Sequence, residues 1–106
     1  MLAPFNKDFS ASTSIDTLRF KWYVCNNYQF ELPGGISMVI DPFLPPDTGY
    51  SAEDYGKVDY VLVNHTHGDH IGTLTQTYET YKPKRVFCHA AVAYEITVMV
   101  NDALKL

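Results

Sequence analysis

Residues 58–70 of the chain are VDYVLVNHTHGDH, the stretch that most limits what fold the rest of the sequence can adopt. Val58 to Val63 form a nearly continuous apolar run, the pattern of a strand buried on both faces. Asn64 ends the run, and three of the four histidines then fall within six residues, His65 to His70. The cluster therefore follows a predicted buried strand, at the kind of strand end where open α/β sheets place their sites.

The histidine cluster contains imidazole and carboxylate groups, the donors that divalent zinc, iron and manganese accept. Side chains two positions apart in an extended segment share a side, so His65 and His67 can bind one ion. Gly68 permits a bend, after which Asp69 and His70 can face a second ion. A pair of metal ions at this cluster is therefore chemically reasonable.

Each of these residues, taken alone, also has an interpretation without metal. His65 and His67 would be polar loop residues, and Asp69 would be the N-cap of a helix that begins near His70. For the four residues together we favour the metal site, because three imidazoles beside a carboxylate bring no evident structural gain without an ion. Asp69 can serve as both cap and ligand.

The pattern His-x-His-x-Asp-His after a buried strand resembles the hallmark of the metallo-β-lactamase-fold hydrolase superfamily and matches it without substitution. Ile40 to Leu44, with the sequence Ile-Asp-Pro-Phe-Leu, resembles a segment of the subgroup similar to ascorbate-6-phosphate lactonase. The resemblance implies two divalent ions, zinc first and manganese or iron as alternatives. It places one ion on His65 and His67 and the other on Asp69 and His70, with a bridging water.

The resemblance also implies roles for residues around the ions. Asp41 would be the acid behind the ligands that orients the metal-binding loop, since a ligating histidine needs a partner on its other nitrogen. On local sequence alone, Asp41-Pro42 is equally a simple turn. Asp69 is the predicted catalytic residue, which would orient a metal-activated water and pass its proton. Flavodiiron relatives resemble His-x-Glu-x-Asp-His, so His67 disfavours oxygen-reducing di-iron chemistry.

The superfamily completes its site with a third histidine for the first metal, a bridging aspartate and a final histidine, all on later segments. His89 is the one other histidine here, and its two interpretations are a further metal ligand and a polar residue at a strand-to-helix junction. We expect residues 1–17 to be a loose leader. Residues 18–106 would be the first half of an αββα sandwich of the α/β (α+β) class, with a mixed sheet and one or two outer helices.

Before the motif, alternation of apolar and polar residues predicts half-buried strands at Leu18 to Cys25, Tyr28 to Leu32 and Ile36 to Ile40. Pro33-Gly34-Gly35 supplies the turn of a hairpin. Pro42 to Gly56 is expected to be a long loop with one helical turn at Ser51 to Tyr55. Tyr50 and Tyr55 in this loop would line the pocket or be ordinary surface.

After the motif, Ile71 to Lys82 is predicted to be a helix with Ile71, Leu74 and Tyr78 on one face, ended by Pro83. Arg85 to Cys88 is predicted to be a strand, and the strand, helix, strand order predicts that the last two strands pair in parallel. We predict a helix for Ala90 to Leu104, although Ile96 to Val100 would also suit a strand.

The composition, with 46% hydrophobic and 19% charged residues in 106, is that of one packed domain. The net charge of -4 argues against nucleic-acid and anionic-membrane partners. No stretch of eighteen apolar residues or secretory signal is present, so we expect a cytoplasmic protein. Cys25 and Cys88 are expected to be reduced, buried and structural, with a single disulfide as the alternative.

Two hypotheses of function follow. In the first, the chain is the amino-terminal part of a metal-dependent hydrolase acting on a small-molecule lactone, ester or phosphoester. In the second, it is a truncated, non-catalytic metal-binding remnant or module. Nucleic-acid processing is disfavoured because no basic patch supports it. Half a sandwich leaves an apolar face bare, so we expect self-association or a complementing carboxyl-terminal segment rather than a stable monomer.

Overall fold

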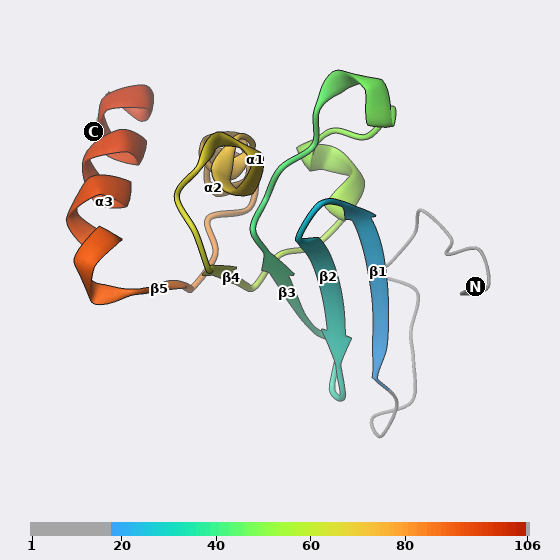
Figure 1. The fold of residues 1–106 in the computed structure, drawn as a ribbon. Helices are drawn as coiled ribbons and strands as arrows, with labels where there is room; N and C mark the ends of the chain where they lie inside the picture. The colour runs from blue at the N-terminus through green and yellow to red at the C-terminus, as the bar shows by residue number, and fades with distance from the viewer. Residues whose placement is uncertain (1–17, 106) are drawn as a thin grey trace.

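The computed structural model describes residues 18–105 and shows one five-stranded sheet with helices (Figure 1). The strands lie in chain order, β1 (Arg19–Val24), β2 (Asn27–Leu32), β3 (Ile36–Ile40), β4 (Tyr60–Val63) and β5 (Arg85–Cys88). The first three pair antiparallel, whereas β3, β4 and β5 pair in parallel. The predicted α/β (α+β) class with a mixed sheet is confirmed, and the predicted leader lies outside the described residues.

Two crossover connections produce the parallel half of the sheet. The long loop between β3 and β4 contains two short 3-10 helices, η1 (Pro46–Thr48) and η2 (Ala52–Tyr55). Helices α1 (Gly68–Ile71) and α2 (Leu74–Tyr81) connect β4 to β5, and α3 (Ala90–Leu104) lies beyond the β5 edge, far from the β1–β2 hairpin (Figure 1). The helical turn in the loop, the parallel β4–β5 pair and the last helix are all confirmed.

The sheet has one covered face and one open face. On the covered face, alternate side chains are buried under the long loop and the helices: Lys21, Tyr23, Gln29, Glu31, Ser37, Val39, Val61 and Val63. The strand register places on the opposite, open face Phe20, Trp22, Tyr28, Phe30, Met38, Ile40, Tyr60, Leu62 and Phe87. Trp22 is 55% exposed and Phe87 48% exposed, so the open face is an apolar surface in contact with solvent.

Strand β4 was predicted to be buried on both faces, but it is buried on one face only. Val61 and Val63 are buried, but Tyr60 and Leu62 are only half-buried. Nothing in residues 18–105 forms a layer over the open face, so the prediction is wrong for this chain. The apolar run reflects a strand with apolar side chains on both sides, one of which is left uncovered.

The covered face contains a buried polar network as well as an apolar core. The Tyr23 hydroxyl donates to Oε1 of Gln29 (2.6 Å), and Nε2 of Gln29 donates to Oγ of Ser37 (3.0 Å) and to the carbonyl of Tyr55 (2.8 Å). The Tyr55 hydroxyl donates to Oδ1 of Asn27 (2.7 Å). Burial raises the pKa of both tyrosine hydroxyls, so they remain protonated donors. Tyr55 is therefore a core residue and does not line a pocket.

The predicted helix over Ile71 to Lys82 is broken into two pieces by contacts with the long loop. The N–H of Thr73 donates to the carbonyl of Pro42 (3.0 Å), and the N–H of Leu44 donates to Oγ1 of Thr73 (2.8 Å). These bonds hold Thr73 outside helical geometry, with φ −115° and ψ 10°. The predicted apolar face is right, because Ile71, Leu74 and Tyr78 pack in the core.

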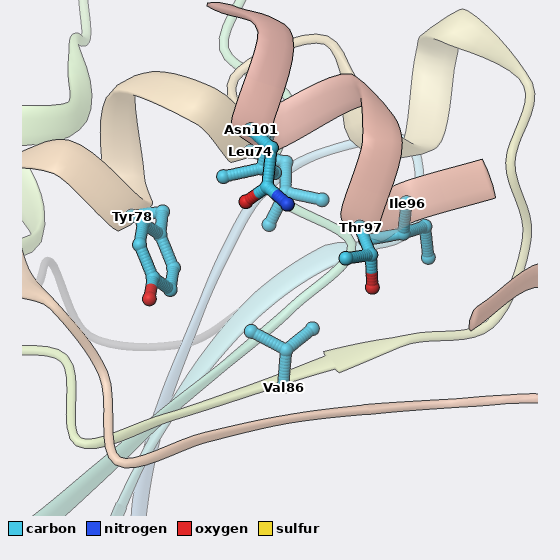
Figure 2. Close-up of a pocket in the computed structure, with 7 residues that line it drawn as sticks. Leu74, Tyr78, Val86, Ile96, Thr97 and Asn101 are labelled. Carbon is cyan, nitrogen blue, oxygen red and sulfur yellow. The ribbon is translucent and has the colours of Figure 1, made fainter. Parts of the chain in front are cut away.

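Helix α3 packs on the core mainly through Ile96 and Val100. It leaves a pocket of about 200 Å³ between itself, α2 and β5, which Figure 2 shows in close-up. The lining is mostly apolar and comprises Leu74, Tyr78, Val86, Ile96, Thr97, Val100 and Asn101. No carboxylate, histidine or cysteine lines this pocket, so it offers no characteristic metal ligand. No helix within residues 18–105 is long and apolar enough to cross a membrane.

The two cysteines are free thiols, as predicted, but they are not buried. Cys25 is exposed in the β1–β2 turn, where its φ of 47° lies in the left-handed region. Cys88 is half-buried at the end of β5. Free cysteines are usually buried. Cys25 is an exception because it lies in a tight hairpin turn, where its side chain is exposed to solvent.

Candidate metal centre

The histidine cluster lies at the edge of the sheet where β3 and β4 both end. Because the two strands run in parallel, Asp41 after β3 and the loop after β4 come together at this edge. The backbone N–H of Asp41 donates to the carbonyl of Leu62 (2.9 Å), which extends the hydrogen bonding between β3 and β4 by one residue. The β1–β2 turn lies at the same edge, since β2 runs antiparallel to β3.

His65 and His67 are exposed and contact each other directly. Nε2 of His65 lies 2.6 Å from Nδ1 of His67, and the two rings meet edge to face with centroids 4.0 Å apart. The His65 ring also lies 4.8 Å from the ring of His70. The structure therefore brings the three imidazoles of the motif together in one cluster.

His70 contacts the carboxylate of Asp41. Nδ1 of His70 lies 2.7 Å from Oδ2 of Asp41, which is fully buried. A carboxylate can only accept in this bond, so Nδ1 of His70 is the donor, and in the neutral imidazole Nε2 then has the lone pair. The other oxygen, Oδ1, accepts the backbone N–H of Asn64 (2.6 Å), so Asp41 contacts both ends of the metal-binding loop.

Asp69 lies in the first turn of α1, with its side chain 56% exposed. Its Oδ1 is 3.7 Å from Nε2 of His70. The expectation that Asp69 caps this helix is wrong, because the helix begins earlier, at Gly68, and His67 occupies the N-cap position. The carboxylate is consequently not used by a cap and points to solvent beside His70.

His89 caps helix α3. Its Nδ1 accepts the backbone N–H of Ala91 (3.0 Å), and no contact among residues 18–105 joins it to the motif histidines. The position is a strand-to-helix junction, as one of its two interpretations requires.

The donor set fits a zinc-type centre in part. Imidazole and carboxylate are suitable donors, but no three histidine, cysteine, aspartate or glutamate side chains within residues 18–105 form a group able to hold an ion. In addition, two nitrogens bound to one tetrahedral zinc lie about 3.3 Å apart, wider than the 2.6 Å between His65 and His67. These two rings form a hydrogen-bonded pair that must separate slightly to take an ion.

Two residues of this site were not found from sequence. Asn64 supplies a backbone N–H to Asp41, and Asn26, in the β1–β2 turn, donates from Nδ2 to Oδ2 of Asp41 (2.7 Å). The hairpin pattern carried a signal for Asn26, because the turn of an antiparallel pair lies level with the end of the third strand. A polar turn residue at that level is a candidate partner for a strand-end acid.

A second pocket, of about 360 Å³, lies between the long loop and the junction of α1 and α2. Tyr50, Thr73 and Gln76 are among the residues that line it. Gly72 lines it too and leaves no room for a side chain, since an added Cβ would lie 2.9 Å from the Phe43 ring. Phe43 of the Asp-Pro-Phe segment thus packs against the end of α1 and helps to hold the motif near Asp41.

The mixed sheet with a histidine and aspartate cluster at its carboxyl edge defines the class of protein. A family model described as a beta-lactamase superfamily domain matches residues 19–100, and the chain belongs to this family. The predicted resemblance to the metallo-β-lactamase-fold superfamily is confirmed, while the subgroup similar to ascorbate-6-phosphate lactonase stays a prediction.

The chain is similar to curated proteins named UPF0173 metal-dependent hydrolase. It is 44% identical over 55 residues to one from Anaeromyxobacter sp. (strain K), in a match that covers 48% of this chain and 20% of that protein. It is 32% identical over 63 residues to one from Thermodesulfovibrio yellowstonii, covering 56% of this chain and 24% of the relative. The matches thus span a fifth to a quarter of the relatives' length, and no solved structure matched the chain.

Proposed function

We propose that the chain carries the metal-binding part of a metal-dependent hydrolase that acts on a small-molecule lactone, ester or phosphoester. One observation carries the proposal: the motif imidazoles are gathered at one sheet edge, and His70 is oriented by a buried carboxylate, Asp41. Histidines that bind metal ions characteristically donate their other ring N–H to such a carboxylate. The names of the relatives support the same class of activity.

In this proposal His65 and His67 hold one divalent ion, and Asp69 and His70 hold a second, with zinc as the first choice. The chemistry that such an ion would supply is a water whose pKa is lowered to about 7. Nδ1 of His70 donates to Asp41, which leaves Nε2 of His70 for an ion. Because its carboxylate is exposed, Asp69 would be able to take a proton from a water in the site and release it to solvent. His89, whose Nδ1 caps α3, is the weakest candidate ligand.

The test is elemental analysis of the full chain after zinc loading, together with hydrolysis assays on a generic lactone, a carboxyl ester and a phosphodiester. We expect the double variant His65→Ala/His67→Ala to lose one of two bound ions and all turnover. His89→Asn is the matched control, because asparagine keeps the helix cap and removes only the imidazole. A double variant that retains the metal content of the original chain would refute the ligand assignment.

The second candidate function is a non-catalytic metal-binding remnant. The absence of any three-ligand group within residues 18–105 favours it, since two protein ligands hold an ion weakly. The same experiment separates the two candidates. Two ions with turnover identify the hydrolase, and substoichiometric metal without turnover identifies the remnant.

We also propose that the open face is covered by a second β-sheet of the same catalytic domain. The face is continuous across all five strands, contains aromatic contacts such as Phe20–Phe30 and Tyr60–Phe87, and is substantially exposed at Trp22. Exposed apolar surfaces of this kind mark association sites. The chain alone is then expected to self-associate through this face, and a monodisperse 12.0 kDa species with a cooperative melt would contradict it. A cytoplasmic location and the absence of a nucleic-acid partner complete the proposal.

A further inference from the structure

We propose that Asn26 is a positioning residue of the candidate metal centre. By donating to Asp41, it holds the carboxylate in the orientation that fixes the ring of His70. This inference rests on the proposed function, because the fixed ring matters as a metal ligand. It assigns a role in the site to the β1–β2 hairpin, which contains no residue of the histidine motif.

The carboxylate of Asp41 accepts three hydrogen bonds from three separate chain segments. Oδ2 accepts Nδ2 of Asn26 (2.7 Å) from the hairpin turn and lies 2.7 Å from Nδ1 of His70 in α1. Oδ1 accepts the backbone N–H of Asn64 (2.6 Å) from the loop after β4. Asp41 itself is fully buried, so water does not compete for these oxygens. Bonds to a carboxylate in such a setting are short and strong.

Asn26 is needed because the last torsion of an aspartate side chain has no sharp preference. This torsion joins an sp³ carbon to an sp² carbon, and its distribution is broad. The orientation of the Asp41 carboxylate is therefore set by its donors. Without Asn26, Oδ2 keeps only the imidazole of His70 as a partner, and the carboxylate plane can rotate away from Nδ1.

The turn that presents Asn26 is itself held in place. The next residue, Asn27, is fully buried, donates from Nδ2 to the carbonyl of Ile40 (2.9 Å) and accepts the Tyr55 hydroxyl (2.7 Å). On the other side, Nε1 of Trp22 donates to the carbonyl of Cys25 (2.8 Å). Asn26 therefore approaches Asp41 from a rigid frame, which a positioning residue requires.

Three variants of the full chain test the inference. Asn26→Ala removes the amide, and Asn26→Asp keeps the size and the turn preference of asparagine while replacing the donor by an acceptor. Cys25→Gly is the matched control, because it changes the neighbouring exposed turn residue at a positive φ that glycine adopts freely. Circular dichroism melts check the fold of each variant.

The first readout is the tautomer of His70 in the metal-free chain, measured by ¹⁵N chemical shifts at about pH 8.5, where free imidazole is neutral. We expect the original chain and Cys25→Gly to show the proton on Nδ1, and both Asn26 variants to show a mixture. The second readout is the affinity for Co²⁺ alone, followed by its visible absorption. Loss of the direct outer partner of a metal ligand lowers affinity about 10- to 100-fold, and because Asn26 acts one contact further out, through Asp41, we expect a fall of about 10-fold or less.

The outcomes separate this inference from the function on which it rests. If the original chain binds no Co²⁺, the proposed function fails, while the tautomer still decides the role of Asn26. If folded Asn26→Asp keeps the Nδ1 tautomer, the inference is overturned. A tautomer that shifts in Asn26→Asp but not in Cys25→Gly supports it, even where Asn26→Ala does not fold.

Discussion

The covered and open faces of the same sheet differ in the side chains that they bury and expose. On the covered face, polar side chains such as Gln29 and Asn27 are fully buried, and hydrogen bonds satisfy each of them. On the open face, the hairpin presents aromatic rings, and Trp22 is more than half exposed. Polarity therefore does not tell which side of this sheet is inside. The covered face is buried under the long loop and the helices, whereas the open face carries apolar side chains like those of a core but is exposed to solvent.

The largest effect is expected at Gln29, the centre of the covered polar network. Gln29→Ala leaves several buried partners unpaired, and each costs about 1–3 kcal/mol, so we expect a loss of about 4 kcal/mol in the free energy of unfolding. Urea titration measures it. Gln76→Ala, on an exposed position of α2, is the control and should change stability little. Equal effects at the two positions would show that the network contributes nothing.

A smaller effect is expected where the covered face meets the metal loop. Gly72→Ala places a Cβ 2.9 Å from both the Phe43 ring and the Gly68 carbonyl, and overpacking of this kind costs about 2 kcal/mol. Gly68→Ala is the matched control, because a Cβ there meets nothing within 4 Å. Thermal melts of both variants check the prediction, which fails if Gly68→Ala is the more destabilised.

The covered face should also be sensitive to alkali. Burial raises the pKa of Tyr23 and Tyr55 above the ordinary value of 10.0, so above that pH the unfolded chain releases protons that the folded chain retains. Stability from this source is complete below pH 10 and is lost progressively as the pH rises. Tyr55→Phe should cost about 1.5 kcal/mol at neutral pH, through the unpaired Asn27, and should flatten the alkaline decline.

The control for this pH profile is Tyr94→Phe, since Tyr94 is 81% exposed on α3. Its stability should fall with alkaline pH as steeply as that of the original chain. If the stability of Tyr55→Phe declined with alkaline pH as steeply as that of the original chain, Tyr55 would not contribute to the alkaline loss of stability.

The smallest change in stability is expected on the open face. Phe87→Lys alters a residue that is 48% exposed, and substitutions at such positions usually stay within about 0.5 kcal/mol. Its effect on assembly should be large, because a charge on the open face opposes apolar association. Light scattering after size exclusion should show a smaller species than the original chain. Tyr94→Lys on α3 should leave the size distribution unchanged. If Tyr94→Lys gave the smaller species and Phe87→Lys did not, the chain would associate through α3 and not through the open face.

Local patterns were sufficient for the strands, because the alternation at Phe20 to Val24 and the turn at Pro33-Gly34-Gly35 depend on neighbours in sequence. The metal motif was likewise visible, since its residues lie within six positions. Alternation could not reveal which face is covered, because both faces of β4 carry apolar groups. That choice is made by the long loop and the helices that pack on one side.

Features that depend on contacts distant in sequence were missed. The break at Thr73 arises from hydrogen bonds to Pro42 and Leu44, about thirty residues earlier, and helical periodicity carries no trace of them. The role of Asn26 likewise depends on Asp41, fifteen residues later. The contact between Asn26 and Asp41 therefore becomes evident only once β1, β2 and β3 are placed side by side.

The carboxylate shared by the hairpin turn and His70 has a thermodynamic consequence. Binding equilibria are reciprocal, so whatever factor the docked hairpin adds to metal affinity is the factor by which a bound ion stabilises the docked hairpin. A chain that loads metal would protect the amides of β1 and β2 from hydrogen exchange, although no motif histidine lies in those strands. Metal binding and docking of the β1–β2 hairpin would then be coupled through Asp41.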